Sequence, residues 1–261
     1  MPRRRRGGRC CTQGHVRQGG GQVRPRAPAM PAAPIHVRVA SVAGLAGQVP
    51  PARQWLGADE ARRLDALQAG QRAAQFVAGR WIARQLLAQA YGGGWRDWTL
   101  SAAPDSPPQA IGPASAFLSL SHSGDHVACA VGLEPLGLDI ERVLPRKGLD
   151  ALVLAVSSGA ERAALPALRP GSDPVAQREA FFQLWTLKEA WLKRGGGGLF
   201  QTMLGQAVAV SPAATPASAN ACTWRHGDAI LAIHATPPLS WSDTAPANLR
   251  YWCLTPAADA S

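Results

Sequence analysis

The feature that most restricts the fold is a segment of about twenty residues, 175–194, which has helical spacing and runs into glycines at 195–198. Its apolar residues recur three and four positions apart, which predicts one long helix with a buried face. The glycines predict the end of that helix. They would also let the backbone approach a ligand, although a flexible hinge explains them equally well.

This helix carries a carboxylate, Glu189, four residues before an amine, Lys193, so both lie on one face. Such a pair could be a solvated ion pair worth about 0.3–0.5 kcal/mol. The apolar neighbours leave little room for a solvent-facing side; they are Phe181, Phe182, Leu184, Trp185, Leu187, Trp191 and Leu192. We therefore expect the pair to lie near a cleft.

Upstream, the segment 137–141 alternates acidic and apolar residues, as a strand does. Asp139 and Glu141 would share one face roughly 7 Å apart, where their repulsion is roughly 2 kcal/mol at an effective dielectric constant near 20. Leu138 and Ile140 place them near a core. A cation between them would relieve the repulsion, and Mg²⁺ prefers such oxygen ligands. An exposed strand end is the alternative interpretation.

Two further groups are candidates for phosphate binding. Ser121-His122-Ser123 follows a strand predicted at 117–120 and could bind an anion; a buried structural histidine and a Ser–His dyad are the alternatives. Arg80 and Arg84 fall on the apolar face of a helix predicted over 71–91. Buried arginine needs a carboxylate or phosphate partner, and for Arg84 we favour a structural ion pair.

The order of predicted elements indicates an α+β protein. Strands are expected at 35–39, 117–120, 127–131, 136–141, 206–210, 229–235 and 249–254, helices at 59–67, 71–91, 149–156, 160–168 and 175–194, and a loop at 104–115. A long helix followed by strands occurs in both halves of the chain. This recurrence suggests two lobes, without any visible sequence repeat.

The net charge of +10 suggests a nucleic-acid ligand, but eight of the 27 basic residues lie in residues 1–29, which contain no acid. The remainder is nearly neutral. We expect this tail to be disordered; it is either a basic arm for RNA or an acidic partner, or an extension upstream of a start at Met30. Cys10, Cys11 and His15 lack a fourth zinc ligand. No apolar stretch approaches the roughly 20 residues of a membrane span, and the N-terminus lacks the apolar region of a secretory signal. We therefore expect free thiols in the cytoplasm.

Three of these motifs, in this order, resemble the 4′-phosphopantetheinyl transferases of the large, surfactin-synthetase (Sfp) type. They are Leu118-Ser-Leu-Ser121-His122-Ser123, Gly137-Leu-Asp139-Ile-Glu141 and Trp185-Thr-x-Lys188-Glu189-Ala-x-x-Lys193. Arg72-x-x-x-Phe76-x-x-Gly79-Arg80 is similar to the arginine-bearing helix of that family. The resemblance covers about residues 35–255. It implies two similar α/β lobes in pseudo-twofold arrangement, 31–135 and 136–256, after the disordered Arg/Gly-rich tail 1–30.

The resemblance also implies a reaction: transfer of the phosphopantetheine arm of coenzyme A to a carrier-protein serine, with release of adenosine 3′,5′-bisphosphate. Asp139, Glu141 and Glu189 would hold Mg²⁺, Glu189 would help to deprotonate the serine, and Lys193 would neutralise and protonate the departing phosphate. Coenzyme A would contact Arg72, Arg80, Ser121, His122 and Lys188. The family's Gly-Lys-Pro-like turn is replaced here by Asp105-Ser-Pro-Pro-Gln109, which has no basic residue.

We therefore expect a cytoplasmic, monomeric transferase whose partners are coenzyme A and an apo acyl or peptidyl carrier protein, with no nucleic acid or membrane partner. Two alternatives stay open. One is a Mg²⁺-dependent phosphohydrolase that uses the same acids with water as acceptor. The other is a non-enzymatic RNA-binding protein that acts through the basic tail.

Overall fold

The computed structural model describes residues 33–68, 70–103, 106–195, 208–242 and 245–257. These residues belong to one compact unit, 32–261, which is built from antiparallel sheets and helices and is therefore an α+β fold. The tail expected to be disordered lies outside the described residues. None of the described helices is long and apolar enough to span a membrane.

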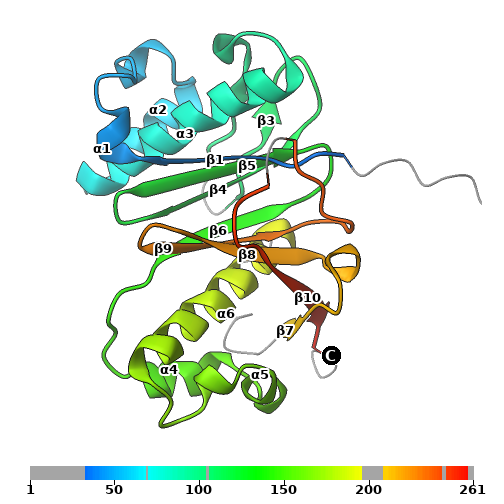
Figure 1. Ribbon diagram of the computed structural model, residues 1–261. Coiled ribbons are helices and arrows are strands. Elements are labelled where there is room, and N and C mark those ends of the chain that lie inside the picture. The colour runs from blue at the N-terminus through cyan, green and yellow to red at the C-terminus, as the bar shows by residue number, and fades with distance from the viewer. Residues whose placement is uncertain (1–32, 69, 104–105, 196–207, 243–244, 258–261) are drawn as a thin grey trace, which may run out of the picture. The chain divides into compact units, whose positions relative to one another are not determined.

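The first sheet contains three antiparallel strands in the order β1–β5–β4, with helix α3 packed against all three (Figure 1). The bounds are β1 His36–Ser41, β4 Phe117–Ser123, β5 His126–Gly132 and α3 Gly70–Tyr91, with α1 Val42–Leu45, η1 Ala52–Gln54, α2 Ala58–Asp65, η2 Trp95–Asp97, β2 Thr99–Leu100 and β3 Ala110–Ile111 around them. Helix α3 ends at Tyr91, and the following residue, Gly92, has a φ of 85°, which glycine adopts without strain.

The second sheet contains five antiparallel strands in the order β6–β9–β8–β10–β7, with helix α6 packed on one face. The bounds are β6 Gly137–Arg142, α4 Leu149–Val156, α5 Gly159–Ala164, η3 Pro166–Leu168, α6 Pro174–Gly195, β7 Val208–Pro212, η4 Pro216–Ser218, β8 Ala221–His226, β9 Ala229–His234 and β10 Arg250–Pro256. The Asp173 carboxylate caps α6 by accepting hydrogen bonds from the amides of Val175 and Ala176.

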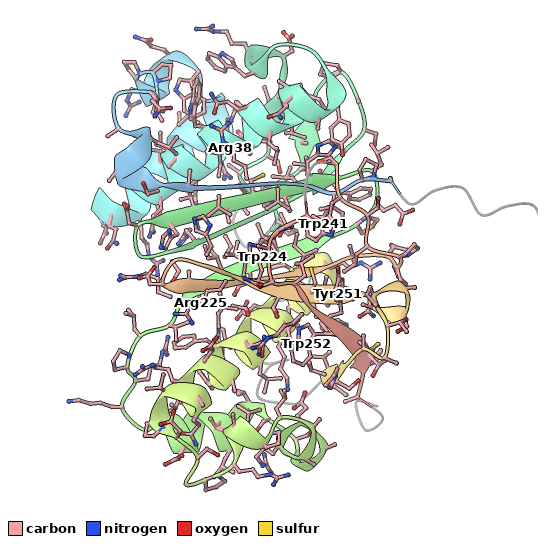
Figure 2. The ribbon with its side chains drawn as sticks, in the orientation of Figure 1. Arg38, Trp224, Arg225, Trp241, Tyr251 and Trp252 are labelled. Atoms are coloured by element: carbon pink, nitrogen blue, oxygen red, sulfur yellow. The ribbon has the colours of Figure 1, made fainter. Side chains whose placement is uncertain are left out.

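The two sheets share a buried core to which β5, β6, β8 and β9 all contribute. Trp224 of β8 belongs to this core and lies 6.0 Å, centroid to centroid, from Trp241, whereas Trp252 of β10 belongs to the core beneath α6. Figure 2 shows these tryptophans on the two sides of the second sheet. Strand β4 of the first sheet also lies beside β6 of the second.

Most predicted elements are confirmed, including both long helices. Two differences matter. Strand β8, Ala221–His226, was not predicted, and Ser121-His122-Ser123, which was expected to follow a strand, forms the last three residues of β4. The turn comes later, at Gly124. The division into lobes at residue 135 stays a prediction.

Candidate active site

Strand β6 and helix α6 approach unusually closely at Gly137. A Cβ atom at this position would lie 1.9 Å from the carbonyl oxygen of Ala190 and 2.7 Å from the amide nitrogen of Arg194. Only glycine fits, because any side chain would overlap the helix backbone. The contact brings the odd-numbered residues of β6 to α6, while Leu138 and Ile140 join the core between the sheets.

Three sequence motifs meet at one ammonium group. Lys193 Nζ of α6 lies 2.7 Å from Asp139 Oδ1 of β6 and 2.9 Å from Ser121 Oγ of β4. Ser121 donates in turn to Asp139 Oδ1 at 2.8 Å. Asp139 is buried, with a side chain only 5% exposed, while that of Lys193 remains 22% exposed. The predicted association of these residues is present, although it is an ion pair and not a ligand set.

Two further carboxylates surround this pair. Burial and the negative charges of Asp139 and Glu141, opposed by Lys193, raise the pKa of Glu189 to about 7. The pKa of Glu141 is also raised, by burial and Asp139, against the hydrogen bond from Ser123 and the charges of Arg146 and Lys193. The mutual effects show that the three acids share one electrostatic environment. A site of this kind favours binding of an additional positive charge.

The described residues contain no ready-made group of three or more histidine, cysteine or carboxylate side chains arranged around an ion. One atom nevertheless fits a cation: Asp139 Oδ2 is buried without a hydrogen-bond partner. Such an unsatisfied oxygen is costly. The donor set of carboxylate oxygens is also what Mg²⁺ prefers. A cation at Asp139 would compete with the ammonium group of Lys193 for the same carboxylate.

His122 and Arg72 lie beside this group. Burial of the ring, followed by the positive charges of Lys193 and Arg72, lowers the pKa of His122, with Asp139 acting in the opposite direction. The imidazole nevertheless retains an exposed surface, as does Arg72. Helix α3 is held here by Gln75, which donates to the carbonyl of Gly124 at 2.7 Å. His122 and Arg72 are therefore both accessible to an anion.

Lys188 does not lie with the other predicted site residues, and its ammonium group contacts Val156 and Glu161. Its ammonium group is buried, donates to Val156 O, and pairs with Glu161 Oε2 at 3.0 Å. Burial lowers the pKa of Lys188, while Glu161 opposes that shift. Glu161 also accepts hydrogen bonds from the amides of Ser158 and Val210. This network joins α4, α5, α6 and β7, so Lys188 has a structural partner in place of a phosphate.

Arg80 and Arg84 also have a carboxylate partner. Both guanidinium groups contact Glu60 of α2, with Arg80 Nε at 3.1 Å and Arg84 Nη2 at 2.5 Å. Burial lowers the pKa of Arg80 to about 10, an effect that Glu60 opposes. The expected ion pair of Arg84 is confirmed. Arg80 has the same structural partner, which leaves its predicted contact with coenzyme A without support.

The contacts that Ser123 and Arg146 make with the acids were not predicted from the sequence. Ser123 Oγ donates to Glu141 Oε2 at 2.8 Å. Arg146 lies close enough to Glu141 to lower its pKa, and its guanidinium carbon is 5.6 Å from the Phe182 ring centroid. The alternation of serine with leucine and histidine over 118–123 signalled that the serines share a face. No pattern in the sequence identified Arg146.

Residues 135–242 match the family model of the 4′-phosphopantetheinyl transferase superfamily. The chain is 41% identical over 86 residues to a 4′-phosphopantetheinyl transferase AcpT of Salmonella typhimurium, covering 33% of this chain and 43% of that protein. It is 36% identical over 81 residues to a 4′-phosphopantetheinyl transferase of Bacillus subtilis, covering 31% and 34%. The chain thus spans less than half the length of these curated relatives.

A solved structure of a holo-(acyl-carrier-protein) synthase from Bacillus anthracis in complex with CoA (3′,5′-ADP) shows a more distant likeness. It is 21% identical, covers 39% of this chain and 96% of that chain, and has a TM-score of 0.33. A likeness this weak supports no inference about the site.

Proposed function

We propose that this protein transfers the phosphopantetheine arm of coenzyme A to a serine of an acyl or peptidyl carrier protein, because residues 135–242 match the family model of the 4′-phosphopantetheinyl transferase superfamily. The observation that carries the proposal is the meeting of Lys193 with Asp139 and Ser121, which joins all three motifs at one point. Coenzyme A would lie between two lobes, 31–135 and 136–256, each built on one sheet and its long helix.

In this reaction the carrier serine oxygen forms a bond to the phosphorus that bears the pantetheine arm. The bond from that phosphorus to the oxygen of adenosine 3′,5′-bisphosphate breaks, and the serine loses its proton. Such transfer depends on positioning, on charge neutralisation and on a base, without a covalent enzyme intermediate. The residues near Asp139 supply each of these functions.

Asp139, Glu141 and Glu189 would hold Mg²⁺, for which the unpartnered, buried Asp139 Oδ2 is the strongest support. When bound, Mg²⁺ neutralises charge on the diphosphate. Lys193 would then turn from Asp139 towards the departing phosphate, which it would neutralise and protonate. Its partial exposure gives it access to such a ligand.

Glu189 would accept the proton of the carrier serine, directly or through water. A pKa of about 7 suits this role, because a general base works best when its pKa is near the working pH. Positive charge brought in by a cation would keep the carboxylate ionised.

His122 and Arg72 would contact the phosphates of coenzyme A, since both retain exposed surface beside Lys193. Ser121 is a poorer candidate, because its hydroxyl already bonds to Asp139, Lys193 and the amide of Ile140. A hydroxyl offers one proton and two lone pairs, so no bonding position is left for a phosphate.

The test is the intact mass of an apo carrier protein after incubation with the full chain, coenzyme A and Mg²⁺. We expect a gain of one phosphopantetheine group. Glu189→Gln should slow transfer roughly 10²- to 10⁴-fold, the usual contribution of a general base. Asp139→Asn should abolish detectable transfer.

The matched control is Glu179→Gln. Glu179 lies on the same helix but pairs at 3.4 Å with Arg225, and both side chains are more than 40% exposed. This variant should transfer at the wild-type rate. An unchanged carrier mass, in a sample where a known transferase modifies the same carrier, would contradict the proposal. Phosphate release without a carrier would favour a phosphohydrolase.

A further inference from the structure

Strand β4 carries serines at three alternating positions, Ser119, Ser121 and Ser123, which all reach towards β6. These strands are edge strands of different sheets: β4 closes the order β1–β5–β4, and β6 opens the order β6–β9–β8–β10–β7. The two sheets therefore meet edge to edge through serine side chains.

Each serine satisfies a main-chain amide of β6. The hydroxyl oxygens of Ser119, Ser121 and Ser123 accept from the amides of Leu138, Ile140 and Arg142 at 2.9, 3.3 and 3.1 Å. The other edge of β6 pairs with β9. Without the serines, three amides on the β4 side would lack these partners, which is costly for buried main-chain groups.

Only two of the three hydroxyls also reach a carboxylate. Ser121 donates to Asp139 Oδ1 and Ser123 donates to Glu141 Oε2, both at 2.8 Å. The third, Ser119, donates to the main-chain oxygen of Leu138 at 3.4 Å. The serines thus share one role in joining the strands, but differ in their relation to the acids.

We propose that Ser121 and Ser123 are positioning residues that fix the orientation of Asp139 and Glu141 for binding of a divalent cation. This inference rests on the proposed function, because it concerns the same carboxylates. It assigns to Ser121 and Ser123 of β4 the task of aligning acids on another sheet. Strand β4 lies outside the segment 135–242 that matches the superfamily.

The geometry at Asp139 explains why orientation matters. Oδ1 accepts from both Ser121 and Lys193, while the buried Oδ2 has no partner. Ser121 therefore holds the carboxylate so that one oxygen stays available. In its absence only Lys193 would hold Oδ1, and the carboxylate could rotate with that flexible side chain.

The experiment measures Mn²⁺ binding to the full-length protein by electron paramagnetic resonance in the presence of coenzyme A. A sample of Mn²⁺ and coenzyme A without protein corrects for Mn²⁺ bound by coenzyme A itself. The variants are Ser121→Ala and Ser123→Ala, with Ser119→Ala as matched control. Loss of a residue that orients metal ligands typically weakens metal affinity roughly 10- to 100-fold. We expect that loss in the first two variants and a change of less than about twofold in the control, since Ser119 touches no carboxylate.

Thermal unfolding of the same samples separates loss of positioning from a general loss of stability, because each of the three variants loses two hydrogen bonds between β4 and β6. Similar melting temperatures with divergent Mn²⁺ affinity support the proposal. Ser123→Thr, which keeps the hydroxyl, should restore most of the affinity lost in Ser123→Ala.

Equal weakening in all three variants, or wild-type affinity in Ser121→Ala and Ser123→Ala, would overturn the positioning role while leaving the transferase proposal intact. Absence of Mn²⁺ binding to the wild-type protein would overturn both the positioning role and the metal assignment. Carrier modification by the wild type, measured in parallel, shows whether the proposed reaction itself has failed.

Discussion

Replacing Gly137 by alanine should separate β6 from α6 and thereby disrupt the candidate site from a position that carries no chemistry. The added Cβ would lie 1.9 Å from the carbonyl oxygen of Ala190. A carbon–oxygen contact normally requires about 3.3 Å, so the strand or the helix must move by roughly 1.4 Å. Glu189 adjoins Ala190, and its carboxylate would move away from Asp139.

The cost follows from the rigidity of both partners. Overpacking of a core costs typically 1–3 kcal/mol, and here the obstacle is main chain on a buried helix. We therefore expect a loss of about 3 kcal/mol, near the upper end of that range. In a unit of this size each kcal/mol lowers the melting temperature by about 2–4 °C, which gives a decrease of roughly 6–12 °C.

Thermal unfolding and Mn²⁺ binding of Gly137→Ala measure the two effects separately. Gly159→Ala is the matched control, because its Cβ meets nothing within 4 Å at the start of α5. It should leave stability unchanged or raise it by up to about 1 kcal/mol. A Gly137→Ala protein with wild-type melting temperature and wild-type Mn²⁺ affinity would refute the inferred close contact.

Two further predictions concern buried charges. Lys188→Met should destabilise the fold by about 3–5 kcal/mol, because it leaves Glu161 without its ammonium partner. The folded variant should keep the wild-type KM for coenzyme A. A raised KM would indicate that Lys188 does bind a phosphate. Between pH 4.5 and about 7, the Glu189 carboxyl group of the metal-free wild type keeps its proton in the folded state but loses it in the unfolded state. The free energy of unfolding of the wild type therefore falls over this range by on the order of 3 kcal/mol. Glu189→Gln lacks this titration, so its stability relative to the wild type should increase as the pH rises. Urea unfolding of both proteins at pH 5 and pH 8 checks this, and a difference that does not change with pH would contradict it.

The two long helices could be predicted because their apolar periodicity and the glycines that follow them are both visible within a short stretch of sequence. Strand β8 was missed because Ala221–His226 lies among short polar and Pro-rich segments and has only weak alternation. The role of Ser121 was only partly predicted. Its position in the motif was recognised, but its partners on β6 lie 18 and 19 residues away along the chain.

Lys188 and Arg80 show the same limit. Arg80 was a candidate phosphate ligand because a buried arginine needs an anion, and Lys188 was one because the resemblance places it at coenzyme A; sequence alone does not say which anion is present. The partners turned out to be Glu161 and Glu60, supplied by other elements of the fold. Asp139 and Lys193, by contrast, were predicted to lie in one site, and they are 2.7 Å apart.

The proposed reaction requires that Asp139 and Glu189 bind one divalent cation beside a diphosphate. The most direct test is anomalous scattering from crystals of the protein grown with Mn²⁺ and coenzyme A. We expect one Mn²⁺ peak bound by oxygens of Asp139 and Glu189, with the Lys193 ammonium group moved away from Asp139. A crystal with coenzyme A bound, no peak at these carboxylates, and Lys193 still paired with Asp139 would contradict it.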